Sequence, residues 1–150
     1  MQNDELRKAQ EELEESRSKY SDLFDFAPVG YLTITEKGLI TEANLTGADM
    51  LGVERQLLID MPLSRFIDRE SQDDFYRQRL TLLETKKKQH CELKMKRQDG
   101  SLFWAVIQIV AKTDDADNVL QVRATLTDIT NRKKAEEKLK NAHDKLKEYD

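Results

Sequence analysis

The chain has 150 residues, of which 38% are hydrophobic and 36% are charged, and its formal net charge is −4. This acidic balance, with both signs interspersed, argues against a nucleic-acid partner. A lone cysteine, Cys91, excludes an internal disulfide and a zinc site built from several thiolates. Without a run of about 18 apolar residues or a signal peptide, we expect no direct membrane insertion and a cytoplasmic location, including as the cytosolic part of a membrane receptor.

The apolar residues are concentrated in the middle of the chain, whereas both ends are mostly charged or polar. We therefore expect an N-terminal amphipathic helix of coiled-coil type at residues 1–22 and a folded domain at residues 23–130. A C-terminal coiled-coil helix is expected at residues 131–150, where it ends in the middle of a heptad and would continue in a longer protein.

Both terminal segments carry a thin apolar seam at heptad spacing. The N-terminal seam is Leu6, Leu13 and Tyr20, and the C-terminal seam is Ala135, Leu139, Ala142, Leu146 and Tyr149. Single helices with so little apolar surface are marginal in water, so each seam predicts a partner helix. We expect a homodimer through these flanking helices.

The first half of the central domain predicts two short strands followed by helices. The strands are expected at 31–35 and 39–43, and Asn44 is expected to cap a short helix that ends at Gly52. Further short helical pieces are predicted at 55–59 and 63–67. Ser71 and Asp74 have the spacing of a capping box, which predicts a longer helix with an apolar stripe of Phe75, Tyr76, Leu80, Leu82 and Leu83.

Three alternating strands follow, at 90–96, 102–111 and 119–127, with Asp99-Gly100 as the first hairpin turn. Alternation places Leu120, Val122, Ala124 and Leu126 on one face of the last strand. The middle strand is apolar on both faces, so we expect the terminal helices to cover the outer face. Altogether the pattern predicts an α+β domain with a five-stranded antiparallel sheet and helices on one face.

Four motifs occur in order on these elements: Ala27-Pro28-Val29-Gly30, Asn44, Arg97-x-Asp99-Gly100-Ser101-x-Phe103-Trp104, and Asp128-Ile129-Thr130-x-Arg132-Lys133. Together they resemble a PAS domain, the sensory module of bacterial signalling proteins, over residues 23–134. The resemblance implies the PAS fold, ligand or redox sensing, dimerisation, and output to a kinase or cyclase through flanking coiled coils.

In PAS domains the ligand pocket lies between the inner face of the sheet and the helices. Strand parity places six candidates there, Cys91, Leu93, Phe103, Ala105, Ile107 and Leu126, and Phe66 and Phe75 are expected to close the pocket from the helical side. None is ionised at neutral pH, so a bound molecule should be small and apolar, or held mainly by backbone groups. The alternative is a filled core without a ligand.

Known cofactor signatures are missing from the sequence. Light-oxygen-voltage domains carry a reactive Cys where this chain has Ser64, and flavin-binding Asn and Gln where it has Ala105 and Leu126. Haem-binding relatives use a His on the long central helix, whereas His90 falls on an outward strand face and His143 in the C-terminal heptads. We predict no haem, flavin or metal, and an inert buried thiol at Cys91.

The sequence also lacks a phosphate-binding glycine loop, a nucleophile elbow and a His-Glu metal motif, so we do not expect an enzyme. The junction between the last strand and the C-terminal helix has no Gly or Pro. Asp128 and Thr130 can cap the helix, and Arg132 or Lys133 is expected to pair with Asp128. The resemblance to PAS domains implies that Asp128, Thr130 and Arg132 relay a signal; the alternative is an ordinary helix start.

These features predict a cytosolic PAS sensory module of a multidomain signalling protein, with a downstream effector domain in the same chain. A sensor histidine kinase is the preferred parent. The alternative is a ligand-free relay or dimerisation module of a diguanylate cyclase or another regulator.

Overall fold

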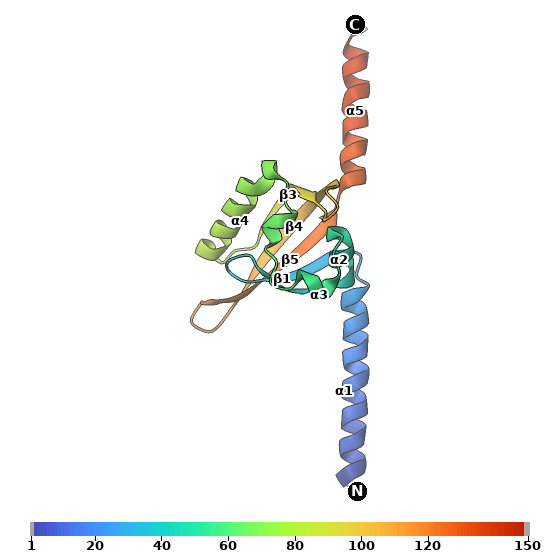
Figure 1. Ribbon diagram of the computed structural model, residues 1–150, viewed down its shortest axis with the longest axis vertical. Coiled ribbons are helices and arrows are strands. Elements are labelled where there is room, and N and C mark those ends of the chain that lie inside the picture. Colours follow the sequence, from blue (N-terminus) through green and yellow to red (C-terminus); the bar gives the residue numbers. More distant parts are fainter. Residues whose placement is uncertain (1, 149–150) are drawn as a thin grey trace.

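The computed structural model describes residues 2–148 (Figure 1). Five strands and five α-helices follow one another in the order predicted from the sequence pattern. The elements are α1 (Gln2–Asp25), β1 (Gly30–Ile34), β2 (Ile40–Ala43), α2 (Leu45–Leu51), α3 (Arg55–Leu58), the 3-10 turns η1 (Leu63–Phe66) and η2 (Arg69–Ser71), α4 (Gln72–Thr85), β3 (Gln89–Lys96), β4 (Leu102–Thr113), β5 (Val119–Asp128) and α5 (Thr130–Glu148).

All neighbouring strands of the sheet are antiparallel, and their order is β2-β1-β5-β4-β3. The last strand therefore lies in the centre, between the first strand and the 102–113 strand. Leu32 faces Ala124 across the β1–β5 ladder, and Ile107 faces Leu126 across the β4–β5 ladder. This architecture confirms the predicted α+β fold with a five-stranded antiparallel sheet.

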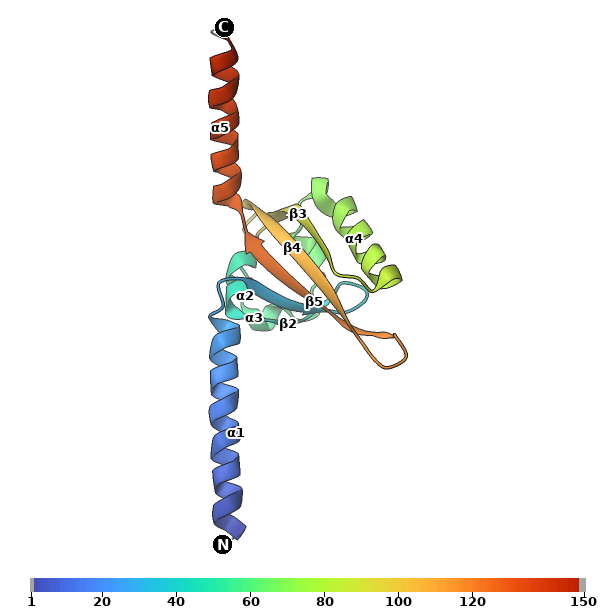
Figure 2. The same ribbon diagram turned by 180° about the vertical axis from the view of Figure 1, so that it is seen from behind.

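The short helices and α4 lie on one face of the sheet, while α1 and α5 run away from the domain in opposite directions (Figures 1 and 2). The expectation that the terminal helices cover the outer face was therefore wrong for most of their length, since only the turns nearest the domain contact that face. Tyr31 and Val110 on that face are each 39% exposed. The thin seams of the two helices give them little apolar surface with which to pack onto a sheet.

One inward residue was predicted wrongly, because the ladder is irregular near its end. Val122, Ala124 and Leu126 are buried, but Leu120 is 60% exposed. The β4–β5 register shifts between Lys112 and Thr113, and such an irregularity moves a neighbouring side chain out of the regular alternation.

The predicted capping box of α4 does not form. Ser71 makes no side-chain cap, and its Oγ accepts the backbone N–H of Lys94 on β3 at 3.0 Å instead. The predicted stripe was also too wide: Phe75 and Leu82 are buried, whereas Tyr76 and Leu80 are exposed. Ser71 is therefore a link between the start of α4 and the edge strand.

Candidate functional site

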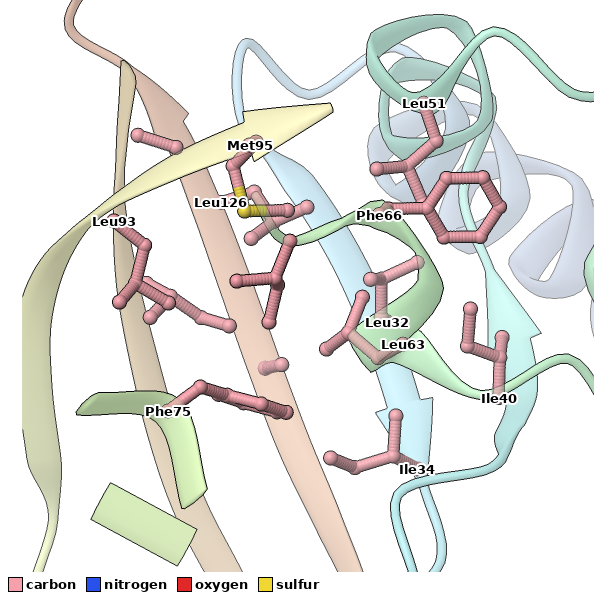
Figure 3. Packing of buried hydrophobic residues seen from close by; sticks show 14 of the residues in the cluster. Leu32, Ile34, Ile40, Leu51, Leu63, Phe66, Phe75, Leu93, Met95 and Leu126 are labelled. Carbon is pink, nitrogen blue, oxygen red and sulfur yellow. The ribbon is translucent and has the colours of Figure 1, made fainter. Parts of the chain in front are cut away.

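The core between the sheet and the helices contains all eight predicted pocket residues. Seven of them are at most 2% exposed (Phe66, Phe75, Leu93, Phe103, Ala105, Ile107 and Leu126), and Cys91 is half-buried at its edge. In Figure 3, Phe66 from η1, Phe75 from α4 and Leu126 from β5 point into one apolar cluster. The core can therefore hold an apolar molecule only if its side chains move apart.

A polar edge to this core was missed by the sequence reasoning. Gln78 on α4 is 7% exposed; its amide donates to the carbonyl of Ile107 at 3.3 Å and accepts the thiol of Cys91 at 3.1 Å. Burial, and to a smaller extent the negative charge of Asp74, raise the pKa of the Cys91 thiol to about 11. At neutral pH the thiol is therefore protonated and unreactive.

Two arginines lie over core aromatic rings, and the sequence did not reveal either contact. The Arg79 guanidinium is 5.4 Å from the Phe75 ring centroid, and that of Arg97 is 4.3 Å from the Phe103 centroid. Arg97 also faces Asp128 at 3.9 Å. One side chain thus touches both a core ring and the strand–helix junction.

A surface hollow of about 460 Å³ lies where the end of α1 meets the outer face of the sheet. Tyr20, Phe24 and Tyr31 form a stacked series in its wall, with ring centroids 6.2 and 6.1 Å apart. None of the eight core residues lines this hollow. The stacked rings show how α1, although it leaves the domain, is fixed to β1 at its last turns.

The joint between α1 and the sheet is centred on one fully buried amide, that of Asn44. Its Oδ1 accepts the backbone N–H groups of Tyr31 and Gly47, each at 2.8 Å, and its Nδ2 donates to the carbonyls of Phe24 and Val29 at 2.7 and 3.1 Å. The predicted helix cap is confirmed, but Asn44 does more. It holds the end of α1, the start of β1 and the start of α2 together.

Further contacts reinforce this joint, which we call the N-terminal joint. Thr46 Oγ1 donates to the carbonyl of Ala27 at 2.6 Å, and Arg55 pairs with the largely buried carboxylate of Asp25 at 2.5 Å. A side chain at Gly30 would place its Cβ 2.9 Å from the Gly47 backbone. Only glycine permits this approach of β1 and α2.

At the other end, the backbone of Trp104 on β4 is bonded to the start of α5. Asp128 Oδ1 accepts the N–H of Thr130 at 2.9 Å, and Thr130 Oγ1 accepts the N–H of Trp104 at 3.1 Å. The N–H of Ile129 donates to the carbonyl of Trp104 at 2.9 Å. The helix therefore starts on a hydrogen-bonded base, which we call the C-terminal joint together with its ion pairs.

The predicted pairing of Arg132 or Lys133 with Asp128 was wrong. Both cations instead bind Glu92 on β3: Arg132 through Oε1, and Lys133 through Oε2 at 2.6 Å. Lys133 also lies 5.0 Å from the Trp104 ring centroid. Asp128 precedes the helix and is turned toward the Thr130 amide, so it is not on the helix face that carries the two cations.

Within residues 2–148, no three His, Cys, Asp or Glu side chains are grouped as metal ligands would be. In the same part of the chain, no helix is long and apolar enough to span a bilayer.

The comparisons with known proteins agree with this geometry. The family model described as PAS domain matches residues 28–131, and the chain belongs to the PAS domain family. It is therefore a PAS sensory domain with helices at both ends. No curated protein matches the chain significantly in sequence.

Solved PAS structures have the same fold at low sequence identity. The PAS domain of an HTR-like protein from Haloarcula marismortui is 20% identical, with a TM-score of 0.69 and coverage of 82% of this chain and 99% of that one. A sensory box histidine kinase/response regulator structure from Burkholderia thailandensis is 16% identical, with a TM-score of 0.67 and coverage of 87% and 98%. A PAS domain of a LuxR-family transcriptional regulator from the same species, in complex with ethanol, is 21% identical, with a TM-score of 0.60 and coverage of 73% and 96%.

Proposed function

We propose that this chain is the non-catalytic, cytoplasmic sensory module of a larger signalling protein. It detects a small apolar molecule in the core and passes the signal to α5 through the C-terminal joint. The observation that supports this proposal most directly is the position of Arg97, which stacks on Phe103 of the core and faces Asp128 at the start of α5. A shift of the Phe103 ring would therefore displace Arg97 and change its contact with Asp128 at the start of α5.

The output is proposed to be a change in the pairing of helices across a homodimer. On α5, Leu139 and Leu146 are 73% and 68% exposed, and on α1, Leu6 and Leu13 are 60% and 51% exposed. Such exposed seams favour a partner helix. Tyr149, the last predicted seam residue, lies outside the described residues.

A histidine kinase remains our preferred parent protein, with a downstream effector domain after α5. Support comes from the structural likeness to the sensory box histidine kinase/response regulator of Burkholderia thailandensis.

The second candidate is a ligand-free relay or dimerisation module, as in a diguanylate cyclase or another regulator. It is favoured by the completeness of the packing, since seven of the eight pocket candidates are at most 2% exposed. The two candidates differ in a measurable way, because only the first requires the core to open for a ligand.

An NMR titration of the purified chain with 1-butanol separates these candidates. Sensing predicts saturable amide shifts at Leu93, Ile107 and Leu126, together with shifts at residues 130–136. Ala105→Leu, which adds side-chain volume at a fully buried position of the core, should abolish them, whereas Ala116→Leu in the exposed β4–β5 loop should not. Shifts that are absent or do not saturate would support the relay instead. Sedimentation equilibrium of the same sample should give a dimer, and a monomer would contradict the proposed output.

A further inference from the structure

Strand β3 is one of the two edge strands of the sheet and lies between α4 and α5. On its inner face, Cys91 is hydrogen-bonded to Gln78 of α4, and Leu93 is fully buried in the core. Between these two residues, Glu92 points to the opposite face, as strand alternation requires. There its carboxylate binds Arg132 and Lys133 of α5. Consecutive residues of one strand thus contact the two helices.

The backbone of β3 is also tied to the segment before α4. The N–H of Lys94 donates to Ser71 Oγ at 3.0 Å, and its carbonyl accepts the N–H of Asp68 at 2.8 Å. Consequently a shift of β3 moves the Glu92 carboxylate that binds α5, and it also strains the hydrogen bonds between Lys94 and the segment before α4. The ladder with β4 is its remaining strand connection among residues 2–148.

We propose that Glu92 is a positioning residue that couples the core to α5 through β3. This route is separate from the Arg97–Asp128 contact, which runs from the β3–β4 hairpin. A displacement of Cys91 or Leu93 moves the Glu92 carboxylate, and the carboxylate pulls the first turn of α5 through two cations on adjacent residues. The biological meaning of this coupling rests on the proposed sensory function, but the coupling itself requires no ligand.

The contacts with Glu92 are exposed, so its effect on global stability is small and its effect on helix position is the quantity to measure. The side chains of Glu92, Arg132 and Lys133 are 40%, 51% and 29% exposed. Exposed ion pairs are weak individually. Two of them on one carboxylate favour one direction of the first helical turn, because each restrains the other.

A matched pair of variants isolates this role. Glu92→Gln removes one negative charge that binds Arg132 across the junction. Glu136→Gln also removes one negative charge near Arg132, but this charge lies on α5 itself, where Glu136 Oε1 is 3.6 Å from Arg132 Nε. We expect Glu92→Gln to raise amide exchange at residues 133–137 by about two- to fivefold, as loss of a weak ion-pair network allows. Glu136→Gln should raise amide exchange at these residues by less than about half of the increase caused by Glu92→Gln, because Glu136→Gln leaves the link between α5 and the sheet intact.

The coupling is then tested with mild core perturbations, Cys91→Ala and Leu93→Val, read by NMR amide exchange on α5. In the parent chain at least one of them should change exchange at residues 133–137. On the Glu92→Gln background that response should shrink by half or more, and on the Glu136→Gln background it should persist. Glu92→Lys should also suppress the response, and adding Lys133→Glu should restore it by recreating one attraction with reversed signs.

Three results would overturn the proposal: no response to either perturbation in the parent chain, an equal response with and without Glu92, or no recovery on charge exchange. All three are measured without a ligand. They therefore stand apart from the 1-butanol titration, which can fail while the coupling through Glu92 persists.

Discussion

The two joints of this domain differ in how far the contacts that hold their helices are exposed to water. The N-terminal joint is organised by Asn44, a neutral amide that is fully buried and makes four hydrogen bonds. The C-terminal joint combines backbone bonds to Trp104 with ion pairs of Glu92 and Asp128 that remain accessible to water. Buried hydrogen bonds are costly to break, whereas exposed ion pairs exchange readily with water and salt.

This difference indicates which joint can adjust. A buried amide has no alternative partners, so displacing α1 from Asn44 would leave backbone groups unsatisfied. The exposed pairs at α5 can lengthen or exchange partners at small cost. We infer that the first joint fixes the domain to its input helix, and that the second permits the movement of the output helix.

The largest expected effect is the loss of Asn44. Asn44→Ala removes a helix cap and leaves several buried backbone groups without partners, so the free energy of unfolding should fall by about 3 kcal/mol or more. Urea unfolding measures this change. Asn44→Asp retains the acceptor but turns a second oxygen toward the carbonyls of Phe24 and Val29, so it should not recover the loss.

The matched control for that substitution is Asn118→Ala, in the exposed loop between β4 and β5, where the amide donates to Asp114 at 3.3 Å. It should cost less than about 0.5 kcal/mol. If the two alanine variants were equally stable, the view of Asn44 as a fixed joint would be wrong.

The next effect concerns Cys91, next to Glu92 on the strand that meets α5. With its pKa raised from 9.0 to about 11, the thiol should react with iodoacetamide at pH 8 about a hundredfold more slowly in the folded than in the urea-unfolded chain. A folded rate close to the unfolded one would show that β3 opens freely, and would weaken the comparison of the joints.

The same shift has a consequence for stability. Because the folded pKa is raised, the neutral thiol contributes stability that is fully present below pH 9 and is lost as the pH rises through about 11. The thermal unfolding temperature of Cys91→Ala should therefore fall less steeply between pH 9 and about 11 than that of the parent chain. Parallel curves for the two proteins would contradict the burial of the thiol.

The smallest effect is expected at Thr130, within the adjustable joint. Thr130→Val leaves the N–H of Trp104 without its acceptor, and should lower the free energy of unfolding by about 1 kcal/mol. Thr127→Val makes the same chemical change on an exposed position of β5 and should be nearly neutral. Urea unfolding compares the two. A loss at Thr130 as large as that at Asn44 would remove the distinction between the joints.

The strand faces were predictable from the sequence because alternation is a local property of an extended chain. It placed Leu93, Ile107 and Leu126 in the core and His90 outside it, and it failed only at Leu120, beside the shifted register. Gln78 was missed for a related reason: its polarity argues for exposure, and only the position of Ile107 and Cys91 across the fold makes its burial acceptable.

By itself, the sequence determined the order of the elements, the cap at Asn44 and the direct passage from β5 into α5, since each depends on residues close along the chain. The predicted five-stranded antiparallel sheet is confirmed, but its central ladder joins Gly30 to Leu126, which are far apart in the sequence. Only the tertiary structure decided the charge partners. Arg132 was expected to bind Asp128, four residues away, but it binds Glu92, 40 residues away. Long charged side chains reach whichever opposite charge the fold places within a few ångströms, and sequence spacing does not record that distance.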